Sequence, residues 1–500
     1  MTRAGDGSDV ALVFRRQIRL LPLVALIYFS VSGGPFSLEE SISSSGAGMT
    51  MVLIIVIPVI FAVPCSLMNA ELGSALPLEG GYYAWVKIGL GKFWGFMEGM
   101  ISWVSSWLDT ALYPVIFVDY LATWFPELQR GRHVMFSLWD GTFSLDAHWF
   151  AAIAFMVPLA YLNARGSRLV GDTSVGLLIV LLIPFVVLVF LGFNHWFTTP
   201  GVEPLQPFTA DGLSPRQAAG AGLAIMIWNY IGFDSVSTAG GEIDNPRRTY
   251  PLALLISVPL IMVTYLLPVL AALASGLHAG DATAWTDGDF AEAGALLGGS
   301  WLQSAIVISA MVAQVGLFSS LLLSGSRVPA VLAADHYLPK PLARINPRTG
   351  TPITSIVVSC GIFAVFVGLD FATLIDADVI LLLLAIVLEF AALIALRHRF
   401  PLMRRPFTVP FGWVGAYGIA VVPTLMVIWL LKSTRVTEPG AFWIGVAMVT
   451  VSAALYPVLS RWAKRGRPDA GLDLTGVDFG PGIDAEAVVR GGWVRGKGGG

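Results

Sequence analysis

Charged and reactive side chains are scarce in this chain. Among its 500 residues only 13% are Asp, Glu, Lys or Arg, and there are two cysteines and six histidines. Cys65 and Cys360 both lie in apolar runs, where isolated thiols pack in a core far more often than they form a disulfide, a metal site or a nucleophile. No segment brings His, Cys and carboxylates together at the spacing of a metal site or a catalytic triad. We therefore expect no enzyme, and no cofactor, metal or nucleic acid among its partners.

Apolar residues dominate instead. They make up 56% of the chain and give a mean hydropathy of +0.74, which indicates a polytopic membrane protein. The start, Met1 to Asp9, lacks the order of a cleaved signal, so the first apolar run is expected to be a retained span. Segments of roughly 17 to 30 apolar residues, long enough to cross a bilayer core of about 30 Å, occur twelve times. The predicted spans are 20–44, 50–72, 93–123, 148–163, 173–193, 218–241, 251–275, 301–325, 353–369, 378–396, 412–431 and 441–460.

Basic residues are distributed unevenly between these spans. If the N-terminus is cytoplasmic, all but five of the Lys and Arg residues fall on the cytoplasmic side, as the positive-inside rule requires. The even number of spans agrees with this orientation. Both termini are therefore predicted to be cytoplasmic, in a multi-pass protein of the cell membrane. The five exceptions are Arg130, Arg132, Arg216, Lys432 and Arg435.

Two spans are interrupted near their middle by small and polar residues. The first break runs from Ser32 to Phe36 and the second from Trp228 to Ser235. Backbone that leaves its helix inside a bilayer is tolerated only where it lines a cavity, so the pair indicates a solute site at the midplane. The breaks lie five spans apart, and spans 1 to 5 begin on the opposite side from spans 6 to 10, which is typical of an inverted repeat. The alternative is that the Gly and Pro residues only pack or kink these helices.

The spans and breaks predict one membrane domain with short flanking segments. The tail is rich in Gly with scattered charge, so it is expected to be disordered and cytoplasmic. The predicted units are a cytoplasmic segment 1–17, a transporter domain 18–465 with repeats at about 18–196 and 215–400 and extra helices at about 412–460, and the tail 466–500.

Carboxylates enter the predicted spans, whereas Lys and Arg do not. A buried carboxylate without a basic partner is costly, so each must be protonated, hydrogen-bonded or matched by a bound cation. The site is thus predicted to favour cations and protons. Histidine is not expected to carry the proton, because all six map to loops or span ends. The carboxylates within spans are Glu39, Glu40, Glu98, Asp109, Asp234 and Glu389, and all but Glu40 are candidates for proton coupling.

Span 3 carries a polar stripe. Glu98, Ser102, Ser105, Asp109 and Tyr113 follow helical spacing, so they share one face of a helix over about 22 Å. Such a stripe is expected to line a permeation path. The alternative is that it bonds neighbouring helices.

The first break also bears on the kind of substrate. A half-helix N-terminus attracts anions, and in amino-acid carriers the substrate carboxylate commonly takes that place. Here Glu39 and Glu40 lie about one turn into the half-helix that should start near Pro35. A substrate rich in ammonium groups and lacking a carboxylate suits such a site.

Aromatic residues surround the second break. Phe233 is expected to be a gate, with core packing as the alternative. Trp228 and Tyr230 offer cation-π faces, or they anchor the helix at the membrane interface. The candidate substrate-binding residues are Ser32, Gly33, Gly34, Pro35, Glu39, Asp109, Tyr113, Trp228, Asn229, Tyr230, Phe233, Asp234 and Ser237.

At these residues the chain resembles the amino acid-polyamine-organocation (APC) superfamily. The two breaks look like its first and sixth helices, and further motifs are similar to its proton-coupled polyamine uptake (PUT), or LAT-like, branch. The resemblance runs from about Arg15 to Lys464. The motifs are Val31 to Phe36, Gly80 to Val86, Trp94 to Phe96, Asp109 to Val115, Gly232 to Thr238 with Glu242, Asn245 and Pro246, Leu388 to Ala392, and Arg404 to Phe407.

The resemblance implies an all-α integral membrane protein with 12 transmembrane helices, arranged as a leucine-transporter-like (LeuT-like) 5+5 inverted repeat with broken helices 1 and 6. It further implies alternating access and import of polyamines or amino acids driven by protons. The chain departs from proton-coupled amino-acid members that carry a Lys in helix 5, because no basic residue lies between Arg168 and His195. A carboxylate is therefore expected to couple protons, with sodium coupling as the alternative.

The sequence as a whole predicts a secondary active transporter that carries small cationic solutes of the putrescine and spermidine class in symport with protons. Glu39, Asp109 and Asp234 are the expected partners of the ammonium groups. The alternatives are a permease or exchanger of cationic or neutral amino acids, and a membrane-embedded nutrient sensor that binds without transport.

Overall fold

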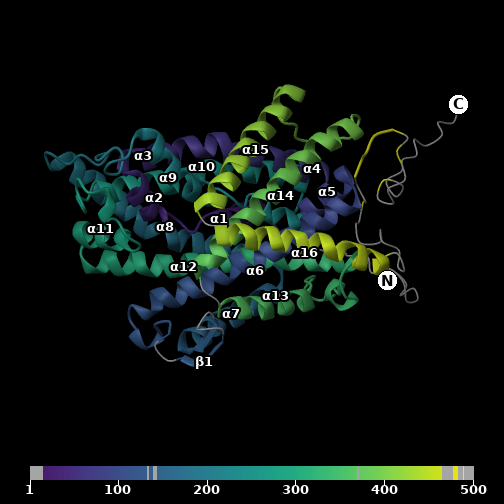
Figure 1. Cartoon of the computed structure of the whole chain (residues 1–500), viewed down its shortest axis with the longest axis horizontal. Coiled ribbons are helices and arrows are strands. Elements are labelled where there is room, and N and C mark those ends of the chain that lie inside the picture. Colours follow the sequence, from purple (N-terminus) through teal and green to yellow (C-terminus); the bar gives the residue numbers. More distant parts are fainter. Residues whose placement is uncertain are drawn as a thin grey trace.

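The computed structural model describes residues 15–131, 134–138, 143–368, 371–437 and 439–463, together with 474, 477–481, 483 and 488. Most of the predicted N-terminal segment 1–17 and of the predicted tail 466–500 lies outside these described residues. The described chain forms a bundle of long helices that run along the longest axis of the molecule (Figure 1). A short antiparallel hairpin of β1 (Val134–Leu138) and β2 (Phe143–Asp146) lies at its edge.

Within the described residues, nine helical stretches are long and apolar enough to cross a membrane, and shorter apolar helices occur at α1 (Leu20–Val31) and α13 (Ile353–Phe366). The expectation of a multi-pass helical membrane protein is thus confirmed. The nine stretches lie in α3 (Ala47–Ile57) with the π-helical turn η1 (Pro58–Ala62) and α4 (Val63–Ala75), in α6 (Lys92–Ala122), α7 (Ala147–Arg165), α8 (Ser167–Thr198), α10 (Pro246–Leu273), α12 (Ser300–Ala334), α14 (Phe371–Arg399), α15 (Gly412–Thr437) and α16 (Pro439–Ala463).

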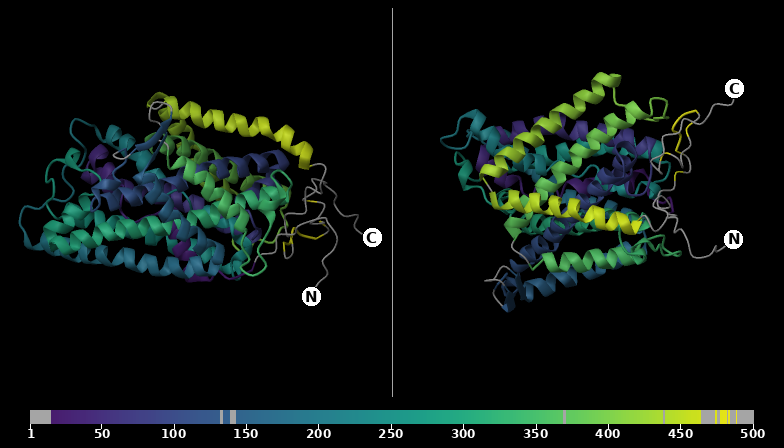
Figure 2. Two further views of the ribbon diagram at one scale, coloured as in Figure 1. Left: turned by 90° about the horizontal axis from the view of Figure 1, so that it is seen from below. Right: turned by 45° about the vertical axis from the view of Figure 1, so that its right-hand side comes forward.

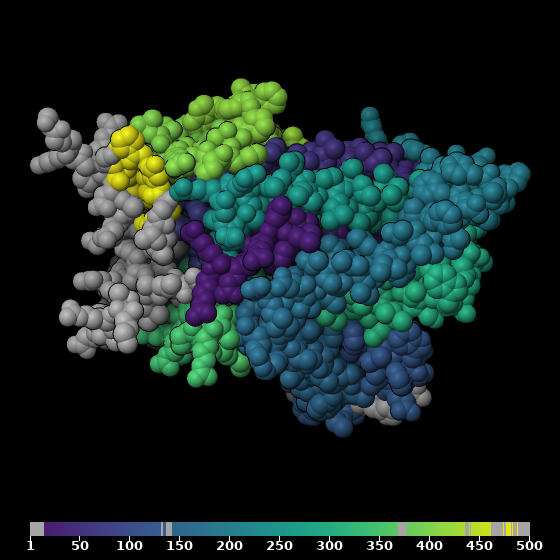
Figure 3. All heavy atoms as spheres, turned by 180° about the vertical axis from the view of Figure 1, so that it is seen from behind, coloured from purple at the N-terminus to yellow at the C-terminus, as the bar shows by residue number. Residues whose placement is uncertain are grey.

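Burial distinguishes the centre of the bundle from its edge. Helix α12 packs against α1, α6 and α8, and 72% of its most apolar window is buried. The corresponding shares are 22% for α15 and 11% for α16, and Figure 2 shows α16 along the outside of the bundle. Apolar side chains that are exposed on these outer helices suit contact with lipid. Figure 3 shows the purple N-terminal segment between the teal of α10 and the blue of α8, and both helices pack against α1.

The first predicted break is present. Helix α1 ends at Val31, and α2 (Leu38–Ser45) begins after an irregular segment. Gly34 and Ser37 within that segment have positive φ angles of 90° and 75°, which a continuing right-handed helix excludes. The Ser32 hydroxyl accepts a hydrogen bond of 3.1 Å from the Gly34 amide. The side chain of Ser32 therefore satisfies a backbone group that the lost helix leaves without a partner.

The second predicted break is also present. Helix α9 (Pro215–Trp228) starts with a capping box between Ser214 and Gln217 and ends at the break. Beyond it the chain forms only two short 3-10 turns, η3 (Ser235–Thr238) and η4 (Gly240–Glu242). The predicted span 218–241 is therefore α-helical only to Trp228, and its residues after the break form 3-10 turns. Three glycines in this stretch explain the loss, because glycine weakens a helix.

Two short helices lie between the predicted spans. The segment between the predicted spans 50–72 and 93–123 contains α5 (Gly81–Leu90), in which every residue except Leu90 is buried. Helix α11 (Asp289–Gly298) packs against α12 within the segment between α10 and α12. Each of these helices is only ten residues long, which is too short for a search based on bilayer thickness. The short 3-10 turns η2 (Pro126–Leu128), η5 (Ala282–Ala284) and η6 (Lys340–Ala343) complete the described elements.

Gly232 provides a test of the second break. Its φ is 107°, and a Cβ at this position would press against the carbonyl oxygen of Ser30 in α1. We expect Gly232→Ala to lower the free energy of unfolding by about 1–3 kcal/mol, because it adds backbone strain at a left-handed position. The measurement is thermal unfolding of the purified protein in detergent.

Gly220 is the matched control for this substitution. It lies within α9 with open space around its Cα. Gly220→Ala is expected to be neutral or to stabilise the helix by up to about 1 kcal/mol. Equal melting temperatures for the two variants would contradict the role assigned to Gly232.

Candidate functional site

The two breaks contact each other. The Ser37 hydroxyl donates a hydrogen bond of 3.2 Å to the side-chain oxygen of Asn229. Gly232 lies against the carbonyl of Ser30, and the Tyr265 hydroxyl of α10 donates to the carbonyl of Asn229 at 3.0 Å. Groups of neighbouring elements therefore form hydrogen bonds and contacts with the irregular backbone of these segments. Such partners are needed inside a bilayer, where no water satisfies free backbone groups.

An inner carboxylate group surrounds the second break. It consists of Glu98 on α6, Asp234 in the break and Glu389 on α14, which act electrostatically on one another. Glu98 and Glu389 are 0% exposed. The Ser102 hydroxyl donates to Glu98 Oε1 at 3.0 Å. Among the described residues, Glu98 Oε2 and both carboxylate oxygens of Glu389 have no hydrogen-bond partner.

An outer carboxylate pair lies further along the same two helices. Asp109 on α6 accepts a hydrogen bond of 2.7 Å from the Tyr113 hydroxyl. Asp378 on α14 is fully buried and accepts a hydrogen bond from Ser105 of α6. The two carboxylates act on each other, and both act on Tyr113. The predicted polar stripe therefore lies on one continuous helix, and it also bonds a neighbouring helix, as the alternative reading proposed.

Asp378 is the site residue that the sequence reading missed. It stood at the first position of a predicted span and was not counted among the buried carboxylates. A signal was available in the spacing: Asp378 precedes Glu389 by eleven residues, as Glu98 precedes Asp109. Two acidic pairs with equal spacing on two apolar helices indicate that each carboxylate of one helix faces a carboxylate of the other at the same depth in the membrane.

Glu39 is separate from both carboxylate groups. It is 1% exposed, and the backbone amides of Gly288 and Phe290, at the start of α11, face its carboxylate. Tyr120 and the loop residue Asp287 also act on it. Burial raises the pKa of Asp287, and the negative charge of Asp289 raises it further. The N-terminus of a helix stabilises an anion, so the start of α11 favours the Glu39 carboxylate, although its Oε2 has no hydrogen-bond partner among the described residues.

Aromatic and hydroxyl groups near the breaks are held by packing. Phe233 is 1% exposed and belongs to the hydrophobic core. The Tyr230 hydroxyl donates to the carbonyl of Ile54 at 3.1 Å, while its ring packs against Tyr265. Ser237 accepts a hydrogen bond of 3.3 Å from the Tyr82 amide. In this conformation these residues are structural neighbours of the site.

The remaining candidates near the breaks have different degrees of exposure. Trp228 and Gly33 are partly buried, whereas Pro35 is buried. The ring of Phe36 packs against Tyr120, Phe185 and Phe290. This aromatic cluster ties the first break to α6, α8 and α11.

Basic side chains do enter the bundle, contrary to the sequence-based expectation. Lys87 of α5 lies 2.5 Å from Asp335, which also accepts a hydrogen bond from Tyr83. Arg327 of α12 is 0% exposed and lies 2.8 Å from Glu242. The predicted span 301–325 was too short to include Arg327, because α12 continues to Ala334. These charges are paired with carboxylates other than those of the inner and outer groups.

A third ion pair ties the end of α14 to α4. Glu71 accepts hydrogen bonds from Arg397 and lies 3.3 Å from Arg405. Two sets of buried carboxylates can therefore be distinguished, apart from Glu39 and Glu79, which belong to neither. Those near residues 71, 242 and 335 have cationic partners, and those of the inner and outer groups act mainly on other carboxylates.

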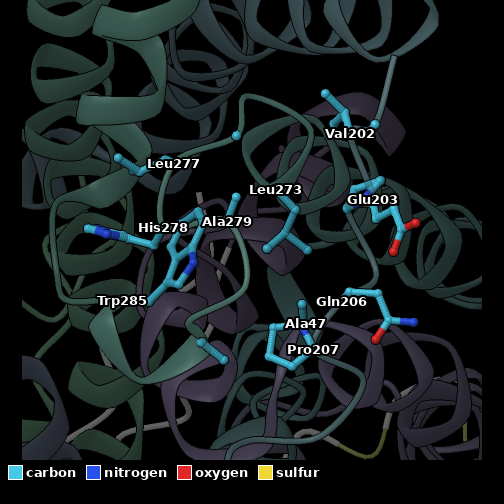
Figure 4. A pocket seen from close by; sticks show the side chains of 14 residues that line it. Ala47, Val202, Glu203, Gln206, Pro207, Leu273, Leu277, His278, Ala279 and Trp285 are labelled. Atoms are coloured by element: carbon cyan, nitrogen blue, oxygen red, sulfur yellow. The ribbon is translucent and has the colours of Figure 1, made fainter. Parts of the chain in front are cut away.

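One pocket of about 100 Å³ opens among the loops after α8 and α10. Figure 4 shows the rings of Trp285 and Pro207 beside Leu273, with the His278 ring pointing to the side. His278 lies 3.2 Å from Asp289. None of the inner or outer carboxylates lines this pocket, so it is separate from the candidate site. Within the described chain, no group of three His, Cys, Asp or Glu side chains is placed to hold a metal ion.

Apolar membrane-spanning helices, two contacting helix breaks and buried carboxylates beside them are features of multi-pass membrane transporters. The chain matches the amino acid permease family over residues 18–453 and belongs to that family. The resemblance to the APC superfamily is thereby confirmed.

Two curated relatives are polyamine transporters by name. The chain is 32% identical over 451 residues to the polyamine transporter RMV1 of Arabidopsis thaliana, with 90% of this chain and 87% of that protein covered. It is 32% identical over 462 residues to the polyamine transporter PUT1 of Oryza sativa subsp. japonica, with 92% of this chain and 82% of that protein covered. The similarity is therefore not confined to one motif or to one half of the chain.

The buried ion pair between Arg327 and Glu242 is open to a double-mutant test. Arg327→Met leaves Glu242 buried without its partner, so we expect a loss of about 3–5 kcal/mol in the free energy of unfolding. Adding Glu242→Gln should recover most of that loss. Thermal unfolding in detergent measures both effects.

The exposed pair Arg168 and Asp172 is the control, because its side chains are 63% and 56% exposed. Arg168→Met is expected to change stability by less than about 1 kcal/mol. A single Arg327 variant as stable as this control would show that the buried pair is not needed for folding.

Proposed function

We propose that this protein is a secondary active transporter that imports linear polyamines together with protons by alternating access. The observation that carries the proposal is that Glu98, Asp378 and Glu389 have buried carboxylate oxygens with no hydrogen-bond partner in the part of the chain that the structure describes. Protons and ammonium groups are suitable partners for such oxygens inside a membrane. The names of RMV1 and PUT1 agree with this class of substrate.

The proposed architecture is a LeuT-like 5+5 inverted repeat over about 18–196 and 215–400, followed by two further helices. The breaks lie at the first and sixth of the twelve spans that the sequence predicts, which supports this arrangement. A second correspondence supports it as well. A short helix, α5, follows the second span, and another, α11, follows the seventh. In the proposed arrangement five predicted spans separate these two helices, so they lie on opposite sides of the membrane, as the two halves of an inverted repeat require.

Glu389 is the proposed proton carrier. It is fully buried, and Asp234 of the second break acts on it. Two ionised carboxylates at such a site repel each other. A proton on Glu389 removes that repulsion and allows it to donate a hydrogen bond to Asp234. Asp234 is then ionised and oriented to accept an ammonium group, so proton and substrate occupy the site together.

Ammonium binding is proposed for Asp234 and Asp109, with the hydroxyl of Tyr113 beside the latter. The aromatic residue Phe233 is the proposed gate, since it adjoins Asp234. Glu39 is proposed to act at the outer entrance, beneath α11, where it attracts cations before they reach the deeper carboxylates. Rigid-body movement of one group of helices against the other would then open the inner side.

The family description favours one second candidate function. Amino acid permeases carry substrates with a carboxylate, and a cationic amino acid combines this with an ammonium or guanidinium group. Such a substrate would place its positive end at the inner carboxylate group. Competition with labelled polyamine distinguishes the two functions.

The transport activity is tested with purified protein in liposomes. An acidic exterior should drive uptake of radiolabelled spermidine above equilibrium, and a protonophore should abolish it, because the proton gradient supplies the free energy. Unlabelled putrescine should compete more strongly than arginine or alanine. Asp109→Asn should reduce uptake at least tenfold through loss of an ammonium partner. Normal uptake by this variant, or stronger competition by alanine, would contradict the assignment. Binding of spermidine without any flux would indicate a sensor instead.

Proton coupling is tested with Glu389→Gln. The neutral amide cannot carry a proton across the membrane, so uptake against a gradient should be lost. Exchange of internal unlabelled for external labelled spermidine should persist, because exchange needs no net proton movement. Glu127→Gln, an exposed position in η2, is the control and should retain both activities. Gradient-driven uptake by Glu389→Gln at the control rate would assign coupling to another residue.

A further inference from the structure

The inner and outer carboxylates form two levels on a pair of packed helices. Helix α6 carries Glu98 and Asp109, and α14, which packs against it, carries Asp378 and Glu389. Glu98 acts on Glu389, and Asp109 acts on Asp378. The earlier residue of one helix therefore faces the later residue of the other, as in antiparallel helices. Since both pairs are separated by eleven residues, the two levels lie about 16 Å apart at 1.5 Å per residue.

Each level retains unsatisfied acceptor capacity. At the inner level, one oxygen of Glu98 and both oxygens of Glu389 have no hydrogen-bond partner among the described residues. At the outer level, Asp378 Oδ2 likewise has no hydrogen-bond partner among the described residues. All three side chains are 0% exposed. A buried acceptor without a partner is costly, and the charged groups that act on these carboxylates are themselves acidic. With the proposed proton of Glu389 directed to Asp234, the free oxygens of Glu98 at the inner level and of Asp378 at the outer level point to a cationic ligand at each level.

The stretch of α6 between the levels is itself suited to a polyamine. Ser102 and Ser105 lie between Glu98 and Asp109 on the same helical face, and each hydroxyl donates to a carboxylate of one level. A hydroxyl oxygen that donates one hydrogen bond still accepts another. The internal ammonium groups of a long polyamine could therefore donate hydrogen bonds to these serine hydroxyls between the two levels.

We propose that the two levels bind the two ends of a single linear polyamine, so that their separation selects its length. This inference rests on the proposed function and goes beyond it, because it ranks the substrates. An extended chain built from bonds of about 1.5 Å advances by about 1.25 Å per bond. Terminal nitrogens then lie about 16 Å apart in a tetraamine such as spermine, about 11 Å apart in spermidine and about 6 Å apart in putrescine. The carrier therefore prefers spermine, whose ends match both levels, over the shorter spermidine, and putrescine engages only one level.

The test is a competition series with the protein in liposomes. Inhibition constants against labelled spermidine uptake are measured for putrescine, diaminooctane, spermidine and spermine. Diaminooctane has the terminal spacing of spermidine without its internal charge, so it isolates the effect of length. Affinity should rise at least tenfold from putrescine to spermine, and diaminooctane should bind more tightly than putrescine.

Asp378→Asn removes one of the two carboxylate charges of the outer level and leaves the inner level unchanged. The ratio of spermine to putrescine affinity should fall at least tenfold in this variant, because the distal ammonium loses a partner. Asp119→Asn is the matched control. It makes the same chemical change on α6, at a side chain that is 56% exposed, and should leave the ratio unchanged.

The outcomes separate this inference from the proposed function. Equal affinities along the series in the unmodified protein would overturn length selection while polyamine transport stands, and this result does not depend on whether Asp378→Asn folds. An equal loss for every amine in Asp378→Asn would overturn it as well. If no amine in the series competes, the proposed function itself fails.

Discussion

The central constraint on this molecule is the cost of a carboxylate that is buried inside a membrane domain. Such a group must find a cation, a proton or hydrogen-bond donors. Glu71, Glu242 and Asp335 have Arg or Lys partners, and together they tie α4, η4 and the end of α12 to neighbouring helices. Removing one partner from a buried pair is more costly than never burying it. These pairs therefore hold the bundle together.

The carboxylates of the inner and outer groups differ because serine and tyrosine hydroxyls satisfy them only in part. Hydrogen bonds from Ser102, Ser105 and Tyr113 leave oxygens on Glu98, Asp378 and Glu389 without partners among the residues that the structure describes. A fully satisfied set would be stable without any ligand. Because these carboxylates are only partly hydrogen-bonded, their remaining oxygens can bind mobile cations. A carrier needs such oxygens if it is to bind cations and then release them. The helix breaks beside this set supply backbone that can rearrange without breaking a continuous helix.

The sequence contained much of this arrangement but not all of it. Both breaks and the polar face of α6 were predictable, because Gly, Pro and polar residues stand out within apolar spans. Helix α5 was not, since ten residues cannot be recognised as a span. The environment of Glu39 was also hidden, because α11 approaches it from a distant part of the chain. Asp378 was missed because it stood at the end of a span, although its spacing from Glu389 was visible.

Proton movement during polyamine addition tests the central claim most directly. The protein is reconstituted in liposomes that contain a trapped pH-sensitive dye, and spermidine is added outside without an imposed gradient. Symport through the buried carboxylates predicts acidification of the interior, at a rate that saturates with spermidine. Alkalinisation, or no change in internal pH while labelled spermidine enters, would contradict the account.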